Sequence, residues 1–451
     1  MIPAVGLRAG SGSAHRERML SLGVFNNGWW SGAREAARQP ASLLPIAQHS
    51  SGNAYASTLE ARTINGAILH GIFTKHALDP LIDNGGTGLA FVNGAPNIAG
   101  LALAHELARR TLISHFIDPI VTALQGLPWE VVWQSLQSEL WVKAVWDRAQ
   151  VEELRRFGVP RVEPLSMAAP DRDYDTTPLD ARRSAPVVSF VGGQNTSVFD
   201  EGVTMPTRSQ LPAILAHATR GDLPDTTFHE IYHDLYQLAE SVRPGEDVRE
   251  QVRKTRDYFN AKLFYSAALS VRNRDRFVLF LKRKLGERFV LRGKRWDTTY
   301  GLCAEPPFPT NDEYFQHFRE VAINLNLVNG NAETGLNMRH FEVTAAGGFL
   351  LCYQQPELED HFVVGKEVVV FYNERDLLDK IEYYLARPDE RAEIAMAGQR
   401  RTLSEHLYSH RLKAILARVA ETNSKSAESV PGGSSSAPSV PRDGELCLAG
   451  S

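Results

Sequence analysis

The chain has 451 residues, which is too long for one ordinary core and predicts two domains with tails. Hydrophobic residues (43%) and charged residues (23%) are close to globular averages, and the formal net charge of -4 gives no reason to expect a nucleic-acid partner. The three scattered cysteines lack metal-ligand spacing, and no apolar run approaches the roughly 18 residues of a membrane span. We therefore expect a soluble, cytoplasmic protein without integral membrane association.

The N-terminal half begins without regular structure and then alternates strands with helices. Residues 1–55 are rich in Gly, Ser, Ala and Asn, which predicts an irregular segment. Residues 56–171 contain the expected strands GLAFVNG (88–94), LISHFIDP (112–119) and KAVWD (143–147), with helical patterns after the first and the third. Such alternation predicts a parallel sheet.

Four polar residues fall at the C-terminal ends of these strands. They are Asn93, His115, Asp118 and Asp147. Parallel sheets bind ligands outside this edge, so these positions are where chemistry is expected in the first domain.

The second half repeats the alternation after a polar linker, predicted at residues 172–185. The run PVVSFVGG (186–193) is the expected first strand of a second domain that covers residues 186–421. Residues from about 206 to 285 predict a mostly helical insertion in this domain. Residues 422–451 are rich in Ser, Pro and Gly and predict a disordered tail.

The most informative segment is INLNLVNGNAETGLNMRHFEVTAAGGFLLCY (323–353), in which a buried strand leads into a polar loop and a helix. Glu342 on this helix would accept hydrogen bonds from a ribose diol, and Arg339 would neutralise a diphosphate. Gly347 and Gly348 would permit close approach of a ligand to the backbone. The spacing alone leaves open a surface ion pair between Arg339 and Glu342, with the two glycines as a helix C-cap.

The same region resembles the C-terminal signature of the CgeB-like (spore-maturation protein type) glycosyltransferases, a group 1 branch of the GT-B superfamily. The matching motifs are RHFEVTAAGGFLL (339–351), GKEVVVFY (365–372), YYLARPDERAEIAMAG (383–398) and HLYSHR (406–411). The resemblance implies an α/β GT-B fold with two facing Rossmann-like, doubly wound domains. The N-terminal domain would hold the acceptor and the C-terminal domain the nucleotide-sugar donor.

The resemblance also implies which residues hold the donor. Glu342 matches the second of two glutamates that grip the donor in related retaining enzymes. The first would fall at Thr334, with Glu333 one residue away, so the stereochemistry stays open. Gly192 and Gly193, after the first strand of the second domain, would lie next to the diphosphate.

Three further residues are candidates for the donor site. Arg292 and Lys294 would contact phosphate, and Trp296 would face the base, although each also fits an ordinary surface or core position. The nucleotide-sugar is a substrate, so no cofactor and no metal are expected. The implied activity is that of a metal-independent hexosyltransferase.

An inverting enzyme also needs a base near the acceptor hydroxyl. His115 and Asp118 are the candidates, with structural roles in capping or turn formation as the alternative. The acceptor, the sugar and the base of the donor are not defined by the sequence.

Two other functions remain open. Residues 229–233 read HEIYH, a motif that binds zinc when it lies on a helix, with Glu230 as the general base of a peptidase. Alternatively, the chain is a GT-B binding module without catalysis, because residues 1–87 lack the clean opening strands of a complete acceptor domain.

Overall fold

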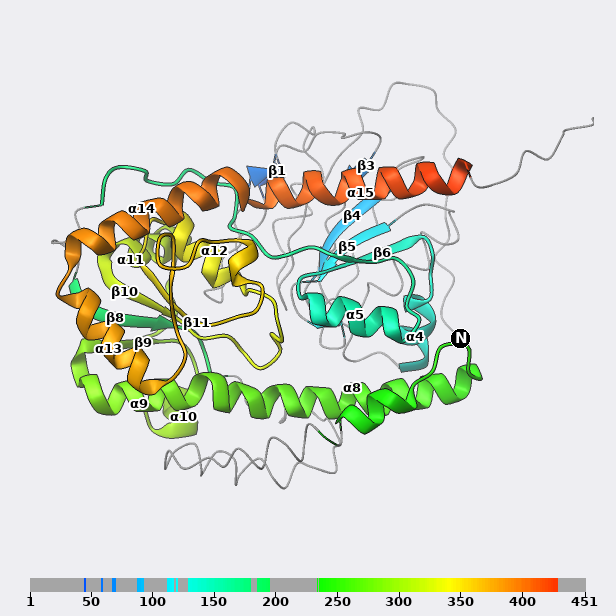
Figure 1. Cartoon of the computed structure of the whole chain (residues 1–451), viewed down its shortest axis with the longest axis horizontal. Helices are drawn as coiled ribbons and strands as arrows, with labels where there is room; N and C mark the ends of the chain where they lie inside the picture. The colour runs from blue at the N-terminus through cyan, green and yellow to red at the C-terminus, as the bar shows by residue number, and fades with distance from the viewer. Residues whose placement is uncertain are drawn as a thin grey trace, which may run out of the picture.

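The protein contains two parallel α/β sheets, as seen in a computed structural model (Figure 1). The two sheets with their helices confirm the predicted α/β fold class. The structure describes residues 129–179, 185–194, 233 and 235–428, with shorter pieces at 44–45, 58–59, 67–69, 87–92, 112–116 and 119–120. Most of the N-terminal segment 1–55, the insertion up to residue 232 and the tail beyond 428 lie outside the described residues.

The first sheet has five parallel strands in the order β3-β4-β5-β6-β7. Its strands are β3 (Ala67–Leu69), β4 (Thr87–Val92), β5 (Leu112–Phe116), β6 (Trp141–Val145) and β7 (Val162–Pro164). Its described helices are α4 (Trp129–Leu136) and α5 (Arg148–Arg156), and a separate antiparallel pair joins β1 (Leu44–Pro45) to β2 (Thr58–Leu59).

The second sheet has five parallel strands in the order β12-β11-β10-β8-β9. Its strands are β8 (Ala185–Val191), β9 (Phe289–Arg292), β10 (Val321–Asn326), β11 (Leu350–Tyr353) and β12 (Val369–Phe371). Its helices are α9 (Arg276–Leu285), α10 (Trp296–Tyr300), α11 (Asn311–Glu320), α12 (Met338–Ala345), α13 (Glu374–Leu385) and α14 (Pro388–Glu405), with short 3-10 turns at Gly286–Arg288 and Leu358–Asp360.

Local sequence accounts for many of these boundaries. Every residue of β6 and β10 is buried, as expected for central strands covered on both faces. The side chains of Asp147, Thr310 and Asn373 cap α5, α11 and α13 by accepting a hydrogen bond from a backbone N–H of the first turn. Pro388 occupies the first position of α14, where its missing N–H costs nothing.

The long helix α8 (Val248–Ser270) runs beneath both sheets (Figure 1). Val252 and Phe259 pack with Phe116 in the core of the first domain. The helix then continues through a π-helical turn, Val271–Asp275, into α9, whose Phe277 belongs to the core of the second sheet. One continuous helical segment therefore contacts both cores.

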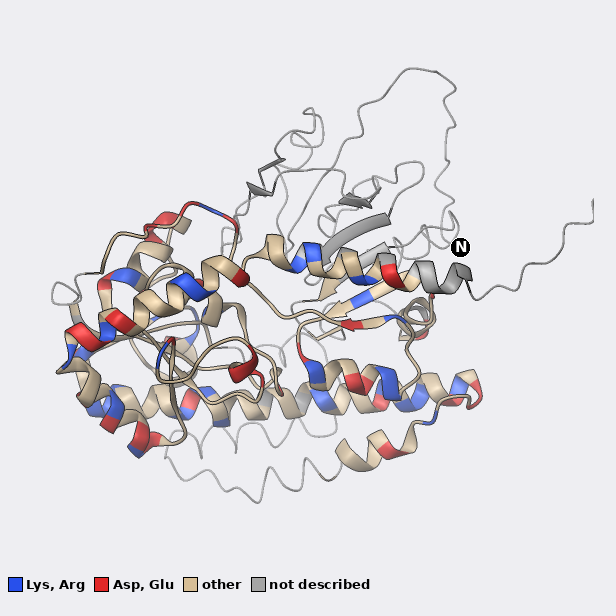
Figure 2. Cartoon of the chain, turned by 45° about the horizontal axis from the view of Figure 1, so that its top comes forward, with Lys and Arg blue, Asp and Glu red and all other residues tan. Residues whose placement is uncertain are grey.

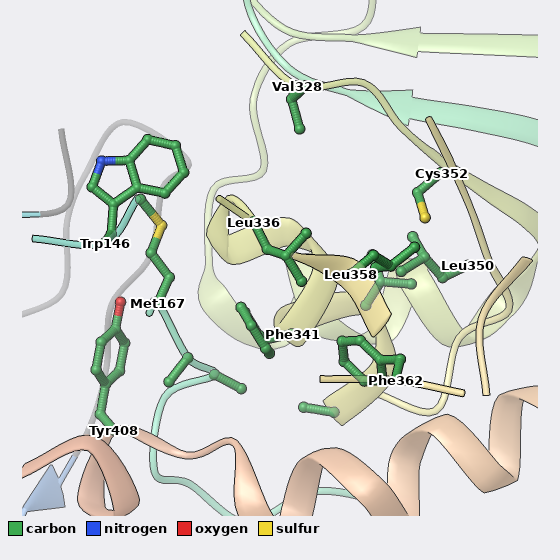
Figure 3. Packing of buried hydrophobic residues seen from close by; sticks show 14 of the residues in the cluster. Trp146, Met167, Val328, Leu336, Phe341, Leu350, Cys352, Leu358, Phe362 and Tyr408 are labelled. Carbon is green, nitrogen blue, oxygen red and sulfur yellow. The ribbon is translucent and has the colours of Figure 1, made fainter. Parts of the chain in front are cut away.

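Besides the cores of the two sheets, a further hydrophobic cluster joins the two domains directly (Figure 3). Trp146 and Met167 from the first domain pack in one cluster with Leu336, Phe341 and Tyr408. All five side chains are at most 4% exposed. The carboxyl end of β6 is therefore packed against the segment around α12.

The last helix, α15 (Tyr408–Glu428), returns to the first domain. The backbones of Ala169 and Leu407 form a parallel bridge, and Arg411 Nε donates to the carbonyl oxygens of Ser166 and Met167, both at 3.1 Å. The motif at 406–411 thus lies where the chain crosses between the domains. Because α15 continues to Glu428, the helix extends past the predicted start of the tail at Thr422.

Acidic and basic positions are interspersed along the described helices (Figure 2). None of the described helices is long and apolar enough to cross a membrane.

Gly330→Ala should destabilise the protein, because this glycine lies where the loop after β10 packs on the end of α8. An added Cβ would lie 2.0 Å from the carbonyl oxygen of Ser266 and 2.6 Å from the backbone nitrogen of Ser270. Backbone atoms cannot yield easily, so we expect a loss of about 1–3 kcal/mol in the free energy of unfolding. Denaturant unfolding measures it, and an unchanged midpoint would show that α8 is not held against this loop.

Candidate functional site

The carboxyl edge of the second sheet carries the candidate site, because β10 ends there and a polar loop leads into α12. Asn326 ends β10 and Asn337 is the N-cap of α12. Their side-chain amides exchange hydrogen bonds of 2.9 and 3.3 Å. This pair fixes the start of α12 beside the end of β10, the edge at which parallel sheets bind ligands.

His340, on the first turn of α12, is fully buried next to this pair. Its Nδ1 lies 3.0 Å from Asn326 Nδ2 and 3.1 Å from the carbonyl oxygen of Asn337. Burial lowers the pKa of His340 to about 4, so the imidazole is neutral at neutral pH and adds no charge to the site.

Glu342 is fully buried on the same helix. Its Oε2 accepts hydrogen bonds from the Tyr314 hydroxyl at 2.5 Å and from Arg339 Nη1 at 3.1 Å. Its Oε1 is buried without a hydrogen-bond partner among the described residues. Desolvation raises the pKa of Glu342 to about 7, and the positive charge of Arg339 opposes this shift. A buried acceptor that lacks a donor is costly, so this oxygen needs an explanation.

Arg339 is the partner of Glu342 in a buried ion pair. Its guanidinium lies 5.0 Å from the ring centre of Tyr314 and 5.6 Å from that of Phe318, and its side chain is only 12% exposed. Arg339 and Glu342 therefore form an ion pair, as the spacing allowed, but a buried one, and the surface pair considered as an alternative is not what forms.

Gly347 and Gly348 lie at the opposite end of α12. Gly347 has a φ of +78°, and the N–H groups of the two glycines donate to the carbonyl oxygens of Thr344 and Val343, both at 2.9 Å. An added Cβ at Gly348 would lie 2.4 Å from the carbonyl oxygen of Phe318. Helix termination and close packing explain both glycines, and contact with a ligand stays a prediction.

Another group of predicted residues gathers where β8 and β9 end. The Gly192 N–H donates to the carbonyl oxygen of Arg292 at 2.9 Å, and Gly193 follows. The Arg292 guanidinium pairs with Glu305 and lies 4.1 Å from the ring centre of Phe308. Lys294 is exposed next to this edge. The structure thus brings these predicted residues together, although Arg292 already has an acidic partner.

Trp296 occupies a core position. It is fully buried, and its indole N–H donates to the carbonyl oxygen of Gly192 at 2.7 Å. Its ring packs against Phe190 and Tyr300. Trp296 therefore occupies a core position, which was the alternative interpretation of the sequence. Its ring is not available to face a base.

Of the two catalytic-base candidates, the structure describes only His115, which is not accessible. His115 is fully buried, its Nε2 lies 2.8 Å from the carbonyl oxygen of Leu165, and its ring contacts that of Tyr408. Burial lowers its pKa to about 4. This environment fits the structural alternative, because a base must reach an acceptor hydroxyl. Asp118 lies outside the described residues.

Most of the HEIYH motif also lies outside the described residues, including His229 and Glu230. Its last residue, His233, is an exposed helical position. Within the part of the chain that is described, no group of three or more His, Cys, Asp or Glu side chains is arranged to hold a metal ion.

The structure adds one residue that the sequence did not single out. Arg274 lies in the π-helical turn before α9 and is 4% exposed. Its Nη1 donates to the side-chain oxygen of Asn329, in the loop after β10. Its Nη2 is buried without a partner among the described residues. π-helical turns occur frequently at functional sites.

Neighbouring residues place Arg274 at the same sheet edge. Asp275 is buried and accepts hydrogen bonds from Gln194, directly after β8, at 3.0 Å and from the Tyr300 hydroxyl at 2.9 Å. Arg274 thus lies between the loops that follow β8 and β10. The run RNRDR (272–276) is the signal for this residue in the sequence, and it lies within the segment predicted as a helical insertion.

Residues 272–417 match the family model described as glycosyl transferase-like. This segment is therefore similar to glycosyl transferases, and we refer to it below as the glycosyl transferase-like domain. It contains β9 to β12 and α12, and with them Arg274, Arg339 and Glu342. No curated protein matches the chain significantly.

Several solved structures are distantly similar to the protein. A sucrose-phosphate synthase (tll1590) from Thermosynechococcus elongatus has 10% identity and a TM-score of 0.38, over 75% of this chain and 74% of that one. Anabaena Alr3699/HepE in complex with UDP-glucose has 11% identity and a TM-score of 0.37, over 74% and 78%. TarM has 9% identity and a TM-score of 0.37, over 74% and 54%. Such distant likenesses do not bear on individual residues of the glycosyl transferase-like domain.

The titration of Glu342 should be visible in the pH dependence of stability. Its folded-state pKa of about 7 lies above its ordinary value of 4.5, so the folded protein binds this proton more tightly than the unfolded chain does. The contribution of Glu342 to stability is therefore present below pH 4.5 and is lost as pH rises through 7.

Glu342→Gln removes this titration and nearly keeps the shape of the side chain. We expect the variant to gain stability relative to the wild type between about pH 5 and about pH 8, by roughly 3 kcal/mol at most. Thermal and denaturant unfolding at both pH values measure the difference. A difference that does not change with pH would show that Glu342 is ionised throughout this range.

Proposed function

We propose that the chain is a glycosyltransferase that moves a sugar from a nucleotide-sugar donor to an acceptor hydroxyl. The observation that carries this proposal is the buried Glu342 carboxylate, which retains an oxygen without a partner on α12 of the glycosyl transferase-like domain. Glu342 is fully buried in this conformation, so a ribose hydroxyl would donate the missing hydrogen bond only once binding opens the surface of α12.

The phosphate groups of the donor would lie between the loops that follow β8 and β10. Arg274 Nη2 supports this position, because it is a buried guanidinium nitrogen without a hydrogen-bond partner among the described residues, while Nε of the same group pairs with Asp275 at 3.4 Å. Phosphate oxygens are strong acceptors for guanidinium groups. Arg339 adds a second positive charge on α12.

The chemistry of such a site is mainly electrostatic. The donor breaks at the bond between the anomeric carbon and the phosphate oxygen, and negative charge develops on the departing diphosphate. Fixed guanidinium groups stabilise that charge without reorganising. Because Arg274 and Arg339 supply positive charge, we propose that transfer does not require a metal ion.

The finer assignment rests on the motifs at 339–351, 365–372, 383–398 and 406–411. They support the CgeB-like branch and transfer of a hexosyl group within the proposed function. The acceptor would lie against the first sheet, and Asp118 remains the candidate base there, whereas the buried His115 is not included in the proposal.

A thermal-shift screen against nucleoside diphosphates and their sugars tests the proposal. A ligand that binds only the folded protein raises its melting temperature. At a hundredfold excess over Kd, it adds about 2.7 kcal/mol to the free energy of unfolding. We expect a shift with the nucleotides of one base, unchanged by a chelator, and release of the nucleoside diphosphate with glycosylation of the acceptor when the correct acceptor is present.

Binding without turnover against a wide panel of acceptors would favour a binding module. No shift with any nucleotide, together with a fall in melting temperature on chelation, would contradict the proposal and favour the motif at 229–233.

Arg274→Lys tests the phosphate contact. Lysine keeps the positive charge next to Asp275 but lacks the second nitrogen of the guanidinium fork. We expect affinity for the nucleoside diphosphate to fall about tenfold while affinity for the matching nucleoside changes little. Calorimetric titration with both ligands measures the two effects.

Arg276→Lys is the matched control, because Arg276 lies two positions away and pairs with Glu374. Equal losses for nucleoside and diphosphate would show that Arg274 supports the fold and does not contact phosphate.

A further inference from the structure

A carboxylate from the first domain is inserted into the loop of the second domain that joins β10 to α12 (residues 327–337). Asp147 follows β6 and is fully buried. Its Oδ2 accepts hydrogen bonds from three successive backbone N–H groups, those of Glu333, Thr334 and Gly335, at 2.8, 3.0 and 3.0 Å. Successive N–H groups that converge in this way form an anion-binding concavity.

The other carboxylate oxygen of Asp147 is also occupied. Oδ1 lies 3.0 Å from Thr334 Oγ1 and accepts a hydrogen bond from the Gln150 N–H at 3.3 Å. All of these partners are neutral dipoles: four belong to the loop, and one, the Gln150 N–H, belongs to the first turn of α5. Since the three loop N–H groups point at one oxygen of Asp147, the loop conformation is matched to this carboxylate.

Gly335 shows how closely the two domains approach here. An added Cβ would lie 3.0 Å from Asp147 Cα and 3.0 Å from Trp146 Cε3. Trp146 packs in the cluster that joins the domains (Figure 3). The absence of a side chain at Gly335 therefore permits the contact that brings Asp147 to the loop.

Two further contacts hold the same loop from the first domain. Gln150 Nε2 donates to the carbonyl oxygen of Asn331 at 2.7 Å. Lys262 of α8 pairs with Glu333 at 2.6 Å and with Glu153 of α5. Lys262 is 9% exposed, so this bridge is shielded from solvent. The loop is thus bound along its length by α5 and α8.

The loop leads directly into the donor-binding residues. It ends at Asn337, the N-cap of α12, and Arg339 and Glu342 lie on the first turns of that helix. At its other end, Asn329 accepts the hydrogen bond from Arg274. A shift of the loop would move Arg339 and Glu342, which follow it on α12, and would break the contact between Asn329 and Arg274.

We propose that Asp147 is a positioning residue for the donor site. It holds residues 331–337 in the donor-binding arrangement from the opposite domain, so that the donor site is complete only while the two domains are in contact. This inference rests on the proposed function, because it concerns the same site. Asp147 itself does not touch the donor.

Asp147→Asn is the first test, because the amide keeps the size of the side chain but offers one acceptor oxygen and places an NH2 group toward the loop N–H groups. Glu163→Gln, on β7 of the same domain, is the matched acid-to-amide control. The probe is whichever of UDP, ADP, GDP and dTDP binds the wild type. We expect its affinity to fall about tenfold in Asp147→Asn and to stay unchanged in the control.

Amide hydrogen exchange separates positioning from general destabilisation. In Asp147→Asn without nucleotide, exchange should accelerate in peptides that cover 331–337, while peptides from β10 and α14 keep their wild-type rates. Acceleration throughout the second domain would reduce Asp147 to a structural role and overturn the proposal.

Gly335→Ala approaches the same contact from the loop side. It should weaken nucleotide binding similarly, and the double variant should lose no more than either single one, because both changes break one contact. Unchanged affinity in Asp147→Asn would overturn this proposal alone. Failure of all four nucleoside diphosphates to bind the wild type would reject the proposed function and, with it, this inference.

Discussion

Buried polar groups must be paired, and this requirement decides how the two sheets of the protein meet. Asp147 is paired with the N–H groups of residues 333–335, and Arg411 with the carbonyl oxygens of Ser166 and Met167. Breaking one partner of a buried charge costs about 3–5 kcal/mol. The apolar cluster around Trp146 adds attraction but is not directional. The polar pairs therefore set the register of the domains, and the apolar contacts stabilise it.

The candidate site, in contrast, contains buried polar groups that have no partner within the described residues. Glu342 Oε1 and Arg274 Nη2 are buried at the carboxyl edge of the second sheet without partners among the described residues. One is an acceptor and the other a charged donor, which are the two groups that a nucleotide with hydroxyls and phosphates would satisfy. The loop from 327 to 337 links them, since Asn329 contacts Arg274 and Asn337 begins α12. These two groups therefore lie where a parallel sheet places a ligand.

The sequence predicted elements whose pattern is local and missed features that depend on the assembled fold. The runs around β8 and β10 are apolar and lead into Gly or Asn, and the apolar run of β11 follows a Gly pair, so their strands and the start of α12 could be predicted. His115 lies on a strand as expected, but its burial and its contact with Tyr408, which is distant in the chain, follow only from the fold. The same holds for Trp296 and Arg274. Only the fold shows that the indole N–H of Trp296 has a hydrogen-bond partner, whereas Nη2 of Arg274 has none among the described residues. No local pattern indicated that α8 would pack on both cores.

The titration of Glu342 gives the unpaired oxygen a thermodynamic meaning. With a pKa of about 7, both protonation states of Glu342 are populated near neutral pH. A hydrogen bond donated to the ionised form favours that form, so a ligand hydroxyl at Oε1 would lower the pKa and bind with partial release of a proton. A carboxylate whose lone pairs are already filled by the protein, such as that of Asp147, offers no position for such a donor. The two buried acids therefore differ in kind: Asp147 fixes the arrangement of the domains, whereas Glu342 remains able to respond to what binds between them.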